Sequence, residues 1–167
     1  NKRYYNGGGA SKLFIDINNN IYFAGALWKV SNQIATSGYL TMKYNKKGDS
    51  IWASSCFDTL KGFSVAYSIC VDKYGYSYVT GGMYVRLRPG YATDAIGTIK
   101  YTPQGDSVWV RIFHNNDSLQ NNYGTDIITD NSGNVYVTGM TSGNISFPLA
   151  AYATIKYDNN GNKLWIK

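Results

Sequence analysis

The chain has 167 residues, a net charge of +6 and no glutamate, because all 10 of its acidic residues are aspartates. It is rich in tyrosine, glycine, asparagine, serine and threonine, and these residue types favour strands and turns over helices. The basic residues are scattered along the chain, and only Arg86 and Arg88 come close to forming a basic patch. Nucleic-acid binding is therefore not predicted. No apolar run reaches the ~18 residues of a membrane-spanning helix, so no membrane span is predicted either.

Short segments of strand-forming residues follow one another along the chain, with turn residues between them. In chain order we predict strands at residues 10–17, 21–27, 39–45, 50–57, 64–72, 76–83, 95–101, 107–113, 124–130, 134–140, 152–158 and 163–167. They fall into three groups of four, and each group has two hairpins joined by a longer loop. This order predicts antiparallel sheets of four strands and no helices.

An internal repeat with a period of 56–58 residues underlies these groups. Each copy carries an aspartate that is followed nine residues later by a glycine: Asp16 and Gly25, Asp72 and Gly81, Asp130 and Gly139. Each copy then carries a lysine-tyrosine pair, a turn and a tryptophan, in the segments KYNKKGDSIW, KYTPQGDSVW and KYDNNGNKLW, which end at Trp52, Trp109 and Trp165. A four-stranded sheet cannot bury both of its faces alone, so stacked repeats predict an all-β fold of β-propeller blades.

We assign structural roles to these repeated residues. The aspartate is expected to accept a backbone N–H bond two residues further on, in the turn after the first strand of each group. The glycine lets neighbouring backbones approach closely, and the tryptophan fills the wedge between adjacent blades. The lysine of each lysine-tyrosine pair is expected to lay its stem over apolar surface, next to an aromatic ring.

The third copy carries the segments DNSGNVYVTG and YATIKYDNNGNKLW, which resemble the bacterial SBBP-type β-propeller repeat. The second copy keeps SICVDKYGYSYVTGG, and the first copy, with FIDINNNIYFAG, diverges most. The resemblance covers the chain from about Ala10 to Trp165. It implies a propeller of about seven blades in a large secreted or cell-surface bacterial protein, and it transfers no catalytic residue.

Three blades do not close a ring, because propellers typically have at least four. We divide the chain into the end of a preceding or complementing strand at 1–9, and blade repeats at 10–63, 64–122 and 123–167. The opening residues NKRYYNGGG are similar to the end of a fourth strand and the loop that follows it. Two expectations stay open: the chain is a segment of a longer array, or several chains associate to complete the ring.

A local function is expected in the loop between the second and third strands of each group, where the three copies differ most. The loops are WKVSNQIATSG, YVRLRPGYATD and TSGNISFPLAA. Aromatic and basic side chains on such loops can form a contact surface for a partner. The candidate binding residues are Trp28, Tyr84, Arg86, Arg88, Tyr91 and Phe147.

The remaining residues with chemical potential are interpreted as structural. His114 is expected on a surface loop, and Asp126 would act as a hydrolase carboxylate only if it faced a central channel. Cys56 and Cys70 are predicted on an outer and an inner strand, too far apart for a disulfide. No metal or cofactor is predicted, with structural calcium at the Asp- and Asn-rich turns as the alternative.

The sequence therefore favours a non-catalytic, extracellular or cell-surface propeller segment that acts as a structural scaffold or a protein-interaction module. The alternative is a propeller surface that binds carbohydrate or another ligand through the loop aromatics. A secreted hydrolase is the third hypothesis. The expected partners are accordingly proteins, further copies of the chain, or a surface glycan.

Overall fold

The computed structural model describes residues 7–31, 34–57, 62–88, 91–114, 122–142 and 150–167. The described residues form twelve strands and contain no helix. The strands are β1 (Gly8–Ile15), β2 (Ile21–Ser31), β3 (Ile34–Tyr44), β4 (Ser50–Cys56), β5 (Val65–Val71), β6 (Ser77–Arg88), β7 (Tyr91–Tyr101), β8 (Ser107–Phe113), β9 (Tyr123–Thr129), β10 (Val135–Ser142), β11 (Ala150–Tyr157) and β12 (Lys163–Ile166). They build three antiparallel sheets of four consecutive strands, which we term blades 1, 2 and 3. The predicted all-β fold is confirmed.

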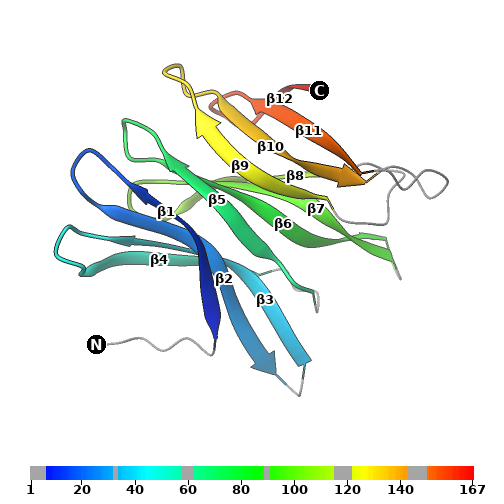
Figure 1. Ribbon diagram of the computed structural model, residues 1–167, viewed down its shortest axis with the longest axis horizontal. Coiled ribbons are helices and arrows are strands. Elements are labelled where there is room, and N and C mark those ends of the chain that lie inside the picture. The colour runs from blue at the N-terminus through cyan, green and yellow to red at the C-terminus, as the bar shows by residue number, and fades with distance from the viewer. Residues whose placement is uncertain (1–6, 32–33, 58–61, 89–90, 115–121, 143–149) are drawn as a thin grey trace.

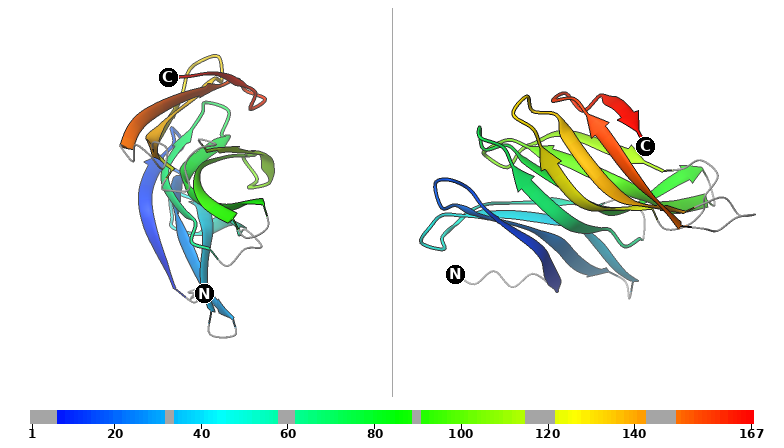
Figure 2. Two further views of the ribbon diagram at one scale, coloured as in Figure 1. Left: turned by 90° about the vertical axis from the view of Figure 1, so that its right-hand side faces the viewer. Right: turned by 45° about the horizontal axis from the view of Figure 1, so that its top comes forward.

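The three blades stand side by side in chain order, with blade 2 between blades 1 and 3 (Figure 1). The first strands of the blades are neighbours, because β5 contacts both β1 and β9. Figure 2 shows the three sheets face against face, fanning out from these inner strands toward the fourth strands. This is the arrangement of blades around a propeller axis.

The second and third strands of blades 1 and 2 are longer than predicted. β2 pairs with β3 out to Ser31 and Ile34, and β6 pairs with β7 out to Arg88 and Tyr91. The predicted loops at 28–38 and 84–94 are therefore wrong in large part, because their residues continue the hairpin ladder and satisfy backbone groups there. The equivalent loop tip of the third copy lies outside the described residues. The boundary predicted after residue 9 is also shifted, since β1 begins at Gly8.

Each turn between the first and second strands is closed by its repeat aspartate, as predicted. The Oδ1 atom of Asp16 accepts the backbone N–H groups of Asn18 and Asn20 at 2.9 and 2.8 Å. Its Oδ2 atom accepts the hydroxyl of Tyr22 at 3.2 Å. The same three contacts recur at Asp72 and at Asp130.

The turn between the third and fourth strands uses the same device. Its first residue accepts two backbone N–H bonds through a side-chain oxygen, and this residue is Asn45, Thr102 or Asp158. The glycine of the same turn has φ between 78° and 94° in every blade. Glycine adopts this left-handed conformation without strain.

The repeated glycine of the second strand faces a β-bulge in the first strand. Gly81 illustrates it: the ladder slips between Ala66 and Ser68, which leaves Tyr67 as the extra residue. A Cβ atom at Gly81 would overlap the carbonyl oxygen of Val65, and Gly25 and Gly139 face equivalent carbonyl oxygens. The predicted close backbone approach is thus confirmed, and the bulge is its cause.

Each blade has two chemically different faces. Cross-strand pairing places Tyr22, Lys43 and Trp52 on one face of blade 1, and this row recurs in the other blades. We term it the tryptophan face. The opposite face carries aliphatic and aromatic residues, such as Ile69, Val79 and Ile99 in blade 2, and we term it the apolar face.

The core lies between the blades, where a tryptophan face meets the apolar face of the next blade. One cluster joins Tyr22 and Tyr39 of blade 1 to the apolar face of blade 2. A second cluster joins Tyr78 and Trp109 of blade 2 to the apolar face of blade 3. The predicted role of the tryptophan as an inter-blade wedge is confirmed for Trp52 and Trp109. The repeated lysines lie over tyrosine rings of their own blade, also as predicted.

Replacing Gly81 by alanine should lower the free energy of unfolding by about 2 kcal/mol or more, because the new methyl group must displace backbone atoms. Urea unfolding followed by circular dichroism measures the change. The matched control is Gly9→Ala, since a Cβ at Gly9 meets no atom within 4 Å. Equal unfolding midpoints for the two variants would contradict the account of the bulge.

Candidate functional site

A hollow of about 660 Å³ opens between blades 2 and 3, at the end of the blades away from the aspartate turns. Volumes of this size are typical of small-molecule sites in proteins. The hollow, which we term the tyrosine pocket, is lined mainly by aromatic side chains and has one carboxylate: Phe63, Tyr67, Tyr84, Asp94, Tyr123 and Met140.

The inner strands position the tyrosines of this pocket. Tyr67 is the extra residue of the β5 bulge, and bulges commonly redirect a side chain. Its ring meets that of Tyr123 on β9 edge to face, with centroids 5.8 Å apart and an interplanar angle of 67°. The Tyr123 hydroxyl donates to the Met140 sulfur at 3.6 Å. Two neighbouring blades therefore hold one aromatic wall.

Asp94 on β7 supplies the charge of the pocket. The residue is partly buried, and its desolvation raises the pKa of its carboxyl. Burial also raises the pKa of Tyr67, and the proximity of Tyr123 and Asp94 adds to this effect. Among the described residues, none donates a hydrogen bond to the Asp94 carboxylate, which lines the pocket.

The structure brings two of the predicted binding residues to this region. Tyr84 lines the pocket, and Trp28 on β2 touches its rim, since its ring lies 5.4 Å from that of Phe63. Arg86 is exposed on β6, two residues beyond Tyr84. The side chains of Arg88 and Tyr91 and the whole of Phe147 lie outside the described part of the chain.

Sequence reasoning missed Phe63, Tyr67, Asp94, Tyr123 and Met140. Asp94 ends the predicted loop at 84–94 but was not selected, and the other four lie outside the predicted loops, in or beside strands. A usable signal was present, because the bulge position holds Tyr67 in the second copy but Ser11 and Thr125 in the others. Disagreement between copies therefore marks function on strands as well as on loops.

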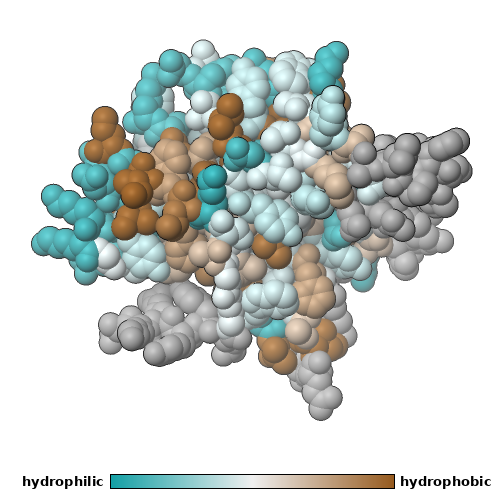
Figure 3. Space-filling model, viewed as in Figure 1, coloured by the Kyte–Doolittle hydropathy of each residue, from teal (hydrophilic) through white to brown (hydrophobic). Residues whose placement is uncertain are grey.

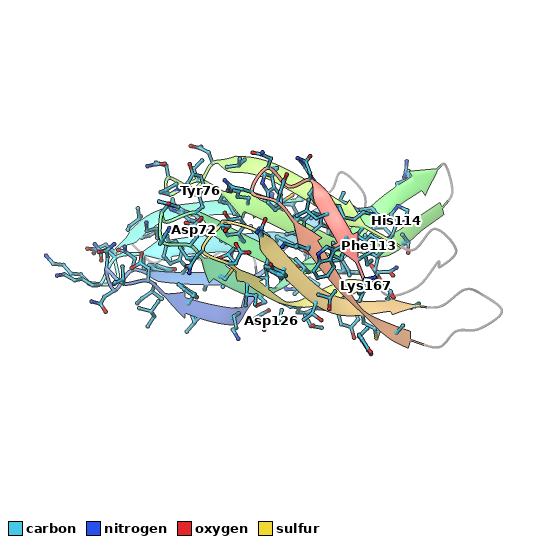
Figure 4. All side chains as sticks on the ribbon, turned by 90° about the horizontal axis from the view of Figure 1, so that it is seen from above. Asp72, Tyr76, Phe113, His114, Asp126 and Lys167 are labelled. Atoms are coloured by element: carbon cyan, nitrogen blue, oxygen red, sulfur yellow. The ribbon has the colours of Figure 1, made fainter. Side chains whose placement is uncertain are left out.

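The two other residues considered for catalysis are not brought together. Figure 4 places Asp126 and His114 in different parts of the molecule. The Asp126 carboxylate accepts the hydroxyl of Ser68 at 2.6 Å, which links the inner strands of blades 2 and 3. His114 directly follows β8, outside the strands, and is partly buried.

The aspartate turns hold their carboxylates in networks of donors. The pKa of Asp130 is lowered to about 2, chiefly by the hydrogen bond from the side-chain amide of Asn134. Backbone N–H groups and the Tyr136 hydroxyl lower it further. A donor set of this kind leaves few lone pairs for a cation. Among the described residues, no group of three or more His, Cys, Asp or Glu side chains is placed to hold a metal ion.

The cysteines lie on β4 and β5 and form no disulfide. This agrees with the predicted separation of Cys56 and Cys70 on an outer and an inner strand. Burial raises the pKa of the Cys70 thiol to about 12, so it is protonated at neutral pH. Cys70 acts as an apolar side chain in the core between blades 2 and 3.

The fold and the inter-blade core define this chain as a set of β-propeller blades. Comparison with protein families agrees, since residues 108–146 match the SBBP family, described as a beta-propeller repeat. The chain therefore contains an SBBP-type repeat, which confirms the family that the motifs of the third copy resemble. The match runs from β8 of blade 2 through β10 of blade 3.

A search of curated proteins finds no match to the chain. In the described ranges there is also no helix with the length and apolar character needed to cross a membrane.

Acidification should weaken the fold in part through Asp130. The pKa of Asp130 is lowered from 3.8 to about 2 in the folded chain. The ionised carboxylate therefore stabilises the fold fully at pH values above its ordinary pKa. That stabilisation is lost as the pH falls from about 4 toward 2. Asp130→Asn should therefore flatten the dependence of unfolding free energy on pH in this window, as measured by urea unfolding. The control is Asp106→Asn, which makes the same substitution at an exposed turn position of blade 2.

Proposed function

We propose that this chain is a non-catalytic module of an extracellular or cell-surface β-propeller, and that it serves as a scaffold and an interaction surface. The observation that carries the proposal is the SBBP repeat itself, within a structure whose repeated polar residues are engaged in turns and inter-blade contacts. Propeller blades of this kind are rigid frames, and binding on rigid frames resides where the copies differ.

The partner contact is assigned to the tyrosine pocket. Exposed aromatic side chains supply large contact areas at low cost in conformational entropy, which makes them frequent anchors in protein interfaces. Tyr67 and Phe63 are exposed at the pocket, and the Trp28 ring extends the same surface onto blade 1. A protein partner would insert an apolar side chain between these rings.

A carbohydrate is the second candidate ligand, and a specific observation favours it. The pocket combines tyrosine rings with the acceptor carboxylate of Asp94. Sugar rings have an apolar face that stacks on an aromatic ring, and their hydroxyl groups donate hydrogen bonds to a carboxylate. Glycoside hydrolysis in contrast uses two carboxylates that flank the scissile bond, and the pocket lining offers one.

Tyr67→Ala and Asp94→Asn test the pocket and its two candidate ligands. The chain is screened against a glycan array and against candidate surface proteins, and each positive ligand is titrated by calorimetry. We expect both variants to weaken binding at least about tenfold, because each removes an anchor group from the centre of the site.

Tyr74→Ala serves as the matched control, since Tyr74 is an exposed tyrosine at the opposite, aspartate-turn end of blade 2. Binding that survives Tyr67→Ala would remove the pocket from the proposal. Release of a hydrolysed product from any bound glycan would overturn the non-catalytic assignment.

A further inference from the structure

The contact between adjacent blades is built the same way twice. Trp52 of blade 1 lies with its ring 6.1 Å from that of Tyr101 in blade 2, and its Nε1 donates to the carbonyl of Pro103 at 3.0 Å. The indole covers Gly105 in the turn that follows, since a Cβ there would lie 2.7 Å from it. We term this arrangement the tryptophan joint.

The second joint repeats these contacts and adds others. Trp109 of blade 2 lies 6.2 Å from the Tyr157 ring, and its Nε1 donates to the carbonyl of Asn159 at 3.2 Å. Arg111, two residues further along β8, donates to the carbonyl of Gly161 at 2.6 Å. Each joint therefore consists of a donor half on one blade and an acceptor half, a tyrosine followed by a glycine turn, on the next.

Blade 3 carries a donor half that no described residue covers. Trp165 keeps its contact to Tyr136 of the same blade, at 6.2 Å, but it is 38% exposed where Trp109 is 7% exposed. Tyr152 on the same tryptophan face is 87% exposed, whereas its counterparts Tyr39 and Ile96 are fully buried by the following blade. The tryptophan face of blade 3 is thus open.

Blade 1 carries the complementary acceptor half, which is uncovered along its first strand, while Leu27, Leu40 and Met42 of the same face are buried in a cluster with Phe23, Tyr44 and Phe57. Leu13 on its apolar face is 63% exposed, while its counterparts Ile69 and Ile127 are each 2% exposed. Gly48 has the left-handed φ of the other turn glycines, yet a Cβ there meets no atom within 4 Å. Figure 3 shows apolar side chains gathered over this side of the molecule, where β1 lies.

We propose that a second copy of this chain docks head to tail on these faces, with Trp165 of one copy seated on the Gly48 turn of the other. The indole would lie against Tyr44, and its Nε1 would donate to the carbonyl of Lys46, which holds the repeat position of Pro103 and Asn159. Lys167 holds the repeat position of Arg111 and would face the carbonyl of Gly48 in the other copy. This inference concerns a different surface from the tyrosine pocket and does not depend on it.

A second copy suits these faces because the 167 residues carry one donor half, on blade 3, and one acceptor half, on blade 1. Such heterologous contacts form a ring when their rotation closes. Two copies supply six blades, within the range of about four to eight found in closed propellers. The contact would continue the geometry of two joints already present in the chain.

The charge of the Gly48 turn sets the salt dependence of this assembly. Lys46 and Lys47 occupy positions that hold Pro103 and Gln104 in blade 2, and Asn159 and Asn160 in blade 3. In the proposed joint these two lysines approach Lys156 and Lys167 of the other copy. Because salt screens repulsion between like charges, association should strengthen as salt is added, and also in a Lys46→Asn, Lys47→Asn variant.

Sedimentation equilibrium of the 167-residue chain over a range of concentrations tests the proposal. The wild type should approach the mass of two chains. Trp165→Ala should weaken association at least about tenfold, as loss of a buried aromatic anchor commonly does. Trp28→Ala is the matched control, because Trp28 is also 38% exposed but lies outside the joint.

A mixing experiment separates a lost joint from a damaged fold. Gly48→Asn fills the space beneath the indole, and asparagine tolerates this backbone, as Asn19 does at φ 61°. A dimer of either variant alone has both of its joints altered. In a mixed dimer, Trp165 of the Gly48→Asn chain meets Gly48 of the Trp165→Ala chain, so one joint is intact. Association should therefore return on mixing.

Several outcomes would overturn the inference. The first is a wild type that stays monomeric at every concentration. The second is a dimer whose association is unchanged by Trp165→Ala. The third is a pair of variants that circular dichroism shows to be folded but that do not associate when mixed. A monomeric wild type would leave the faces to a blade from another polypeptide or from further along the same one. Tyr67→Ala should leave the assembly unchanged, which keeps this test separate from that of the pocket.

Discussion

The fold depends on the contact between the tryptophan face of one blade and the apolar face of the next. A four-stranded sheet of this size cannot bury both of its faces, so each blade obtains its core only from its neighbours. The indoles of Trp52 and Trp109 add directional contacts to this burial, through a ring pair and a hydrogen bond to a turn carbonyl. The same joint therefore holds both pairs of adjacent blades together.

The joint constrains the turns, because the acceptor half is a turn. The backbone must present its carbonyl groups to the indole while a glycine leaves room beneath the ring, as at Gly105 and Gly161. Side-chain oxygens of Thr102 and Asp158 hold these turns by accepting two backbone N–H bonds each. The aspartate turns, at the same end of each blade, are held in the same way. The polar residues of the repeat thus shape backbone, and this leaves ligand binding to residues outside the repeat.

The two surfaces assigned to binding both arise where the repeat is interrupted. The tyrosine pocket forms where Tyr67 replaces a small residue at the bulge, next to Asp94 and Tyr123. The uncovered faces of blades 1 and 3 form because the joint there has one half only. One surface is specific to a single pair of blades, whereas the other would accept any blade that carries the complementary half. A scaffold that also binds a ligand would use the uncovered faces for assembly and the tyrosine pocket for the ligand.

The sequence by itself determined the strand order, the sheets of four, the turn aspartates and the inter-blade tryptophans, because local turn chemistry and a threefold repeat encode them. It also indicated Trp28 and Tyr84. Only the tertiary structure decided that the predicted loops at 28–38 and 84–94 are mainly hairpin arms. It alone gathered Tyr67, Asp94 and Tyr123 into one pocket, since these residues come from different strands and blades. The exposure of Trp165 likewise follows from what lies across from it in space, and no local pattern distinguishes it from Trp109.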